Sequence, residues 1–132
     1  MTAFGLAPSL DDFAVLAEAA FAALPEAFRR MAGEVLFRVE DFADEEVLTS
    51  LGIEDPFELT GLYHGVDVGS RSVLDLAPQP SMVFLYRRPI LDEWAERGDV
   101  TLEALIEHVL VHEIGHHFGL SDAQIEAIEA RG

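Results

Sequence analysis

The chain contains no cysteine, no lysine and no long apolar run. Without cysteine it can form neither a disulfide framework nor a cysteine zinc site, so any metal must be held by His, Asp or Glu. Its eight basic residues, all arginines, face 25 acidic residues, which gives a formal net charge of −17. This charge repels phosphate backbones, so no nucleic-acid partner is expected, and it attracts cations and basic peptides. The simplest interpretation of so many surface acids is solubility.

The absence of a long apolar run also bears on location. No stretch approaches the roughly 20 residues that span a bilayer. The N-terminal sequence "MTAFGLAPSLDDF" lacks the basic start of a secretory signal. We therefore expect a cytoplasmic protein without a membrane partner. With 132 residues, half of them hydrophobic, a single domain over residues 1–132 is expected.

Capping residues predict where the helices begin and end. Polar caps precede helical apolar repeats near both ends of the chain, and two of them have a capping-box partner three residues later. A proline starts a short second helix, and glycines end helices. The residues that mark these boundaries are Ser9, Pro25, Gly33, Thr101, Gly119 and Ser121.

Alternating apolar residues predict strands in the middle of the chain. Val35, Phe37 and Val39 alternate in one segment, and "TGLYHGVDVG" alternates in a second. "SMVFLYRRPI" is the richest in β-branched and aromatic residues; Pro89 cannot donate to a ladder, so we expect an edge strand there. A helix from Pro89 to Gly98 follows. This order predicts an α+β domain whose small mixed or antiparallel sheet, of three to four strands, packs on helices.

The segment "VLVHEIGHHFGLSD", residues 109–122, carries the chemistry. His112 and His116 are four residues apart, so on a helix both imidazoles project from one face and can bind one ion. Glu113 is close enough to reach a water on that ion. This is the H-E-x-x-H spacing of zinc hydrolases. Because the helix is otherwise apolar nearly all round here, we expect these side chains to be interior or to line a cleft.

The residues after this motif add a third ligand. Gly119 lets the chain leave the helix through a left-handed conformation and turn back. Asp122 then stands where a carboxylate completes the set. Two imidazoles, one carboxylate and an open fourth position predict a catalytic site with one zinc ion per chain.

Two alternatives to this ligand set stay open. A His108–His112 pair is geometrically possible, although it lacks the downstream glycine and acid. Asp122 could serve only as a first-turn acid of the last helix, with Glu126 as the ligand instead. The remaining histidines are expected to have packing or structural roles: His64 and His117.

The segments "HEIGHHFGLSD", "LTGLYHGV" and "VFLYRRPI" resemble a family of small bacterial zincin-like metallopeptidases, the minimal zincins. The resemblance extends from about Ala27 to Ala130. It implies a compact zincin core in which an edge strand, from Met82 to Arg87, lies beside the active helix. It also implies a base, Glu113, and three zinc ligands: His112, His116 and Asp122.

The chain departs from the larger zincins in two ways. Its methionines, Met1, Met31 and Met82, all precede the motif, so the methionine turn of metzincins is absent. Only ten residues follow Asp122, whereas larger zincins have a C-terminal subdomain that walls the cleft. A shallow site, open on one side, is therefore expected.

The predicted function is zinc-dependent hydrolysis of a peptide or protein, with an extended substrate pairing to the edge strand. Chemistry alone gives four candidates for a second oxyanion stabiliser: Tyr63, Tyr86, Arg87 and His117. One alternative is a metal-binding interaction module without peptidase activity, whose acidic surface recruits a basic partner. Another is a regulatory protease that acts on one partner protein.

Overall fold

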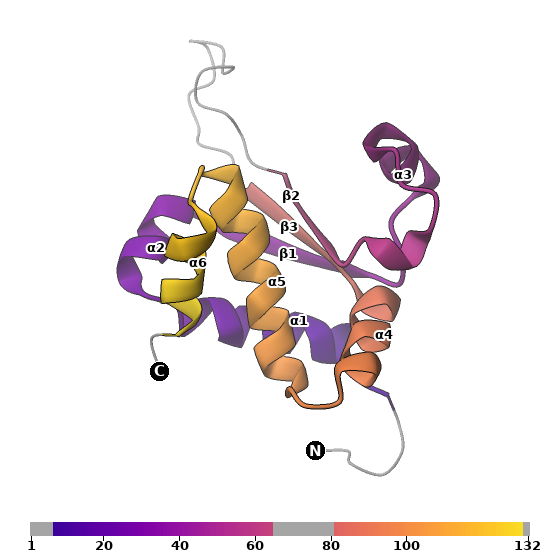
Figure 1. Ribbon diagram of the computed structural model, residues 1–132, viewed down its shortest axis with the longest axis horizontal. Helices are drawn as coiled ribbons and strands as arrows, with labels where there is room; N and C mark the ends of the chain where they lie inside the picture. Colours follow the sequence, from indigo (N-terminus) through magenta and orange to yellow (C-terminus); the bar gives the residue numbers. More distant parts are fainter. Residues whose placement is uncertain (1–6, 65–80, 131–132) are drawn as a thin grey trace.

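The computed structural model describes residues 7–64 and 81–130 (Figure 1). Within these ranges no helix is long and apolar enough to cross a membrane. A mixed sheet packed with helices confirms the predicted α+β class. The described elements are α1 (Leu10–Ala22), α2 (Glu26–Ala32), β1 (Val35–Glu40), α3 (Glu45–Leu51), the 3-10 turn η1 (Pro56–Glu58), β2 (Gly61–His64), β3 (Ser81–Tyr86), α4 (Arg87–Arg97), α5 (Leu102–His117) and α6 (Asp122–Glu129).

The predicted caps are confirmed. The Ser9 hydroxyl accepts a hydrogen bond from the Asp12 amide at 3.1 Å, and the Ser9 amide donates to the Asp12 carboxylate at 2.8 Å. Ser121 and Gln124 make the same reciprocal pair at the start of α6. Gly119 has φ +78°, which lets the chain turn between α5 and α6. These boundaries follow from local chemistry, which explains why the sequence predicts them well.

The described sheet has the strand order β1-β3-β2, with β1 parallel and β2 antiparallel to β3. The expectation that the 82–87 segment is an edge strand is therefore wrong, because β3 is the central strand. Pro89 lies in the first turn of α4, where its missing N–H leaves no helical hydrogen bond unmade. Among the described strands, β2 and β1 form the edges. The predicted strand "TGLYHGVDVG" is confirmed over Gly61–His64; Thr60 precedes the strand, and residues 65–69 lie outside the described ranges.

One face of the sheet carries the main core. Phe37 pairs with Val83 and Gly61 with Leu85, which places alternate residues of all three strands on this face. Helices α1 and α5 cover it, and α5 crosses it diagonally in Figure 1. A second, smaller cluster around Tyr86 packs with Leu48 of α3 and apolar neighbours on the other face.

Two glycines let elements approach α5 closely. A Cβ atom on Gly61 would lie 2.7 Å from Cγ1 of Val109, so β2 packs directly on α5. A Cβ atom on Gly115 would lie 3.0 Å from Cγ1 of the fully buried Ile125, so α6 also packs closely against the helix. The C-terminal half of α5 is thus held between the edge strand β2 and α6.

Candidate metal centre

The motif side chains lie at the C-terminal end of α5 and the start of α6. His112 and Glu113 are half-buried, but the side chains of His116 and Asp122 are 53% and 87% exposed. An interior position, one of the two expected for the motif side chains, is therefore wrong for His116. In the described part of the chain, β2 and α6 flank this end of α5 and leave its last turn open to solvent. His116 and Asp122 are thus accessible to solvent in this part of the chain.

His116 and Asp122 are brought together across the turn between the two helices. The Nε2 atom of His116 lies 3.3 Å from Oδ1 of Asp122. Two ligands of one tetrahedral zinc ion, each about 2.0–2.1 Å from it, lie roughly 3.3–3.4 Å apart. The rings of His112 and His116, one turn apart, meet edge to face with centroids 5.4 Å apart. The structure therefore brings His116 and Asp122 to ligand spacing, but the ligand atoms of His112, His116 and Asp122 do not all lie within 4.8 Å of one another.

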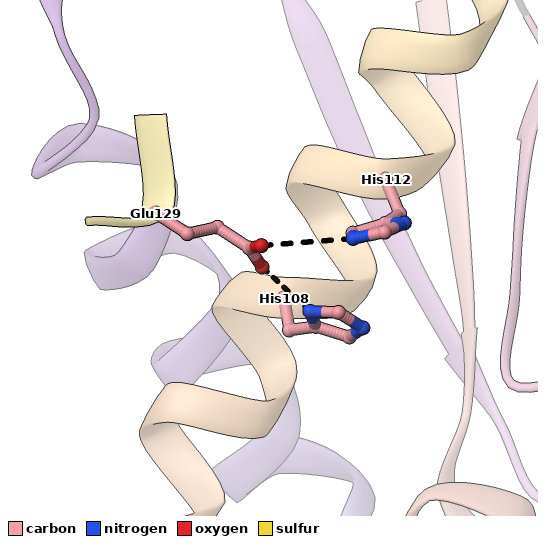
Figure 2. Close-up of side chains that lie close together, drawn as sticks. All are labelled: His108, His112 and Glu129. Carbon is pink, nitrogen blue, oxygen red and sulfur yellow. Dashed lines mark hydrogen bonds and ion pairs between the residues drawn. The ribbon is translucent and has the colours of Figure 1, made fainter. Parts of the chain in front are cut away.

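A second group on the same hairpin is more compact. Ligand atoms of His108, His112 and Glu129 all lie within 4.8 Å of one another, and among the described residues no other three potential ligands meet this condition. Nδ1 of His108 lies 2.5 Å from one Glu129 carboxylate oxygen, and Nε2 of His112 lies 3.6 Å from the other. Figure 2 shows both imidazoles of α5 turned toward the carboxylate at the end of α6.

Glu129 is a residue that sequence reasoning missed. Because Glu129 follows His108 by 21 residues, the spacing of the His108–His112 pair gave no local signal of this carboxylate. The short turn between the two helices could have predicted this contact. Four residues separate α5 from α6, so if α6 folds back along α5, residue 129 lies beside residue 110, between the two histidines. The contacts of Asp122 with His116 and of Glu129 with His108 show this antiparallel arrangement.

Glu113 faces the edge strand. Its Cγ atom would lie 3.5 Å from a Cβ atom on Gly61, so the carboxylate side chain packs where β2 crosses α5. Burial raises the pKa of Glu113, and the nearby His116 opposes this shift. A carboxylate with a raised pKa holds a proton more readily near neutral pH, as a general base requires.

Burial and the neighbouring His108 lower the pKa of His112, while Glu129 opposes the shift. His112 therefore tends toward the neutral imidazole, which is the form that binds a metal ion.

The candidate oxyanion stabilisers differ in their surroundings. Arg87 is engaged elsewhere, because it donates to the Pro8 carbonyl at 2.6 Å and pairs with Asp41 at 3.0 Å. Tyr63 is buried on β2, and its hydroxyl is the one buried side-chain polar atom in the described ranges without a hydrogen-bond partner. Its ring lies 4.5 Å from that of His117. The packing interaction expected of His117 is thus present.

Comparison with known families agrees with this arrangement. Residues 32–131, most of the chain, match the family described as zincin-like metallopeptidase. The chain belongs to this family, which confirms the resemblance drawn from the motif. No curated protein is similar enough to the chain to count as a match. The family and the His-His-Glu group together indicate a site for a metal ion.

Proposed function

We propose that the protein is a zinc-dependent peptidase in which His112, His116 and Asp122 hold one zinc ion and Glu113 is the general base. The observation that carries this proposal is the position of Glu113. It lies on α5 between the two motif histidines and packs against the edge strand β2, and burial raises its pKa.

The side chains present fit a zinc ion. Two imidazoles and a carboxylate are the ligand types of catalytic zinc sites. The 3.3 Å between His116 Nε2 and Asp122 Oδ1 matches the spacing of two ligands on one ion. The high exposure of Asp122 leaves room for water and substrate to reach the fourth position.

In this proposal each part of the chain has a chemical task. A bound zinc ion supplies a water of lowered pKa and a positive charge at the substrate carbonyl oxygen. The Glu113 carboxylate accepts a proton from the attacking water and passes it to the leaving amine. Burial of Glu113 against β2 holds the carboxylate in one position, which keeps the reacting groups aligned.

The substrate is proposed to be an extended peptide that pairs with β2. This strand is an edge of the described sheet, so its outer backbone groups have no strand partner there. It crosses α5 at Gly61, directly beside Glu113. A peptide added to this edge would have its backbone fixed by hydrogen bonds next to the proposed base.

The test compares Glu113→Ala with His116→Ala and Asp122→Ala in tag-free protein. Cleavage of unfolded casein and a peptide panel is measured, together with zinc per chain by elemental analysis. Glu113→Ala should abolish cleavage and keep the metal, whereas the other two variants should lose cleavage and bind zinc more weakly. Unchanged cleavage in Glu113→Ala would refute the proposed mechanism.

A second candidate function is a metal-binding module that recruits a partner without cleaving it. The exposure of His116 and Asp122 favours it, since an open site gives a small substrate few contacts. A fully zinc-loaded wild-type protein that cleaves no substrate in the panel would favour this module. Cleavage of one co-purifying protein alone would instead indicate a regulatory protease.

A further inference from the structure

His108 and Glu129 have no role in the proposed reaction, yet they form a compact group with His112, one of the proposed zinc ligands. His108 and Glu129 are half-buried, and their contact joins α5 to the end of α6. Two imidazoles and a carboxylate are a donor set for zinc-like divalent ions. The group therefore has the chemistry of a metal site as well as that of a contact between helices.

The distances of this group suit one ion. Glu129 presents one oxygen to each histidine, at 2.5 Å and 3.6 Å, and these values bracket the roughly 3.3–3.4 Å between two ligands of a tetrahedral ion. The rings of His108 and His112 are tilted with respect to each other, with centroids 4.0 Å apart. An ion shared by these three side chains would need the His108–Glu129 contact to widen from 2.5 Å to the spacing of two ligands on one ion.

The surroundings give such an ion access. A pocket of about 220 Å³ opens beside the group, with His108 and Glu129 in its lining. Arg97 also lines this pocket, but its guanidinium is held by Glu93 at 2.8 Å. The net charge of −17 favours the approach of cations from solvent.

We propose that His108, His112 and Glu129 form a second divalent-metal position, which shares His112 with the proposed catalytic position so that one ion occupies one or the other. Sharing one imidazole makes the positions mutually exclusive, so the chain binds one ion and not two. An ion held by Glu129 takes His112 from the set that includes His116 and Asp122. This inference rests on the proposed function in one respect only: the competing position is the proposed catalytic site of His112, His116 and Asp122.

The decisive experiment measures zinc binding in a background without His116. Zinc is titrated against a chromophoric chelator into His116→Ala, and into the same variant with Glu129→Gln or His108→Gln added. Glutamine keeps the size and hydrogen-bonding capacity of these side chains, so the helix pairing is retained. His116→Ala should still bind one zinc ion per chain, and each added substitution should weaken binding by at least roughly tenfold.

Matched controls separate ligation from general effects of charge. Glu103→Gln removes an exposed acid from α5, and His64→Ala removes an exposed histidine from β2. Both should leave zinc affinity in the His116→Ala background within about twofold, because neither lies in the group. Complete loss of zinc binding in His116→Ala alone would overturn the proposal, and so would equal affinity with and without Glu129→Gln.

A spectroscopic readout identifies the ligands directly. In ¹H–¹⁵N spectra of the imidazole rings, zinc added to His116→Ala should shift the signals of His108 and His112. Signals of His108 that do not respond to saturating zinc would refute the second position. Neither the zinc titration nor the spectra measure peptidase activity. An inactive wild-type protein would therefore refute the proposed function without deciding whether the second metal position exists.

Discussion

Gly115 and Ile125 meet where α6 packs against α5, and a Cβ atom on Gly115 would lie 3.0 Å from Cγ1 of Ile125. This contact fixes the distance between the helix that carries the histidines and the helix that carries the acids. Asp122 and Glu129 lie at opposite ends of α6, so a shift of this helix moves both candidate carboxylate ligands.

Gly115→Ala should separate the two helices. Overpacking of this kind costs about 1–3 kcal/mol of unfolding free energy, and zinc affinity should fall because the acids move away from the histidines. Urea unfolding and zinc titration measure the two effects. In an Ile125→Ala background, where the obstructing side chain is gone, the substitution should cost less. An equal cost in both backgrounds would exclude this contact as the cause.

Gly61→Ala should displace the edge strand from α5. The added Cβ atom would lie 2.7 Å from Val109 Cγ1 and 3.2 Å from the Phe84 carbonyl oxygen. We expect a loss of about 1–3 kcal/mol of stability and a fall in kcat/KM, because β2 would no longer hold a peptide beside Glu113. Zinc affinity should change little.

The matched variant for this prediction is Val109→Ala, which removes the closest obstructing atom. Combined with Gly61→Ala, it should recover part of the stability that Gly61→Ala alone loses. If zinc affinity instead fell as steeply as kcat/KM, the effect would lie in the metal site and not in the edge strand.

Zinc should stabilise the folded protein. At free zinc 100-fold above Kd, preferential binding to the native state adds about 2.7 kcal/mol, which corresponds to a rise of roughly 10 °C in Tm for a chain of this size. Calorimetry with zinc and with chelator measures the difference. Asp122→Asn should reduce the rise, whereas Asp92→Asn, an exposed acid on α4, should leave it unchanged. Equal rises in both variants would argue against Asp122 as a ligand.

Tyr86 should make stability depend on alkaline pH. Burial raises the pKa of Tyr86 to about 12, and the carboxylates of Glu40, Asp44 and Glu113 add to the shift. A phenol whose pKa is higher in the folded state stabilises the fold below its unfolded pKa of about 10. This contribution, up to about 3 kcal/mol, is lost as pH rises through 12.

The comparison for this prediction is Tyr86→Phe, which has no phenol to ionise. The difference in unfolding free energy between wild type and Tyr86→Phe should be constant below pH 10 and then change toward pH 12 in the direction that destabilises wild type. A difference that stays constant across this range would contradict the raised pKa.

The sequence predicted the helices through local signals. It did not predict the order of the strands, which depends on contacts between residues far apart in the chain. Ser9, Thr101 and Ser121 each cap the expected helix, because a cap involves residues only three positions away. The order of the strands depends on which segments meet in space. Pro89 gave a misleading signal for β3, since the chain enters a helix before the proline could affect the ladder.

At the candidate metal centre, too, the sequence predicted the local features and not the contacts between elements. The spacing of His112 and His116 is fixed by the helix, so a sequence motif reveals that they share a face. The exposure of His116 depends on which elements cover the end of α5. The contact of Glu129 with His108 depends on the direction of α6, which no short motif encodes. The ligand assignment from the motif remains a prediction that the variants above test.

The sequence separation of the contacts indicates the order in which parts of the protein fold. Residues 101–130 contain all the candidate metal ligands, and contacts within such a hairpin close only short loops. The parallel pairing of Val35 with Ser81, by contrast, must close a loop of 46 residues, and the packing of Gly61 on Glu113 spans more than 50. Short loops close first. We therefore expect a refolding chain to acquire metal affinity before it builds the strand edge that receives a peptide.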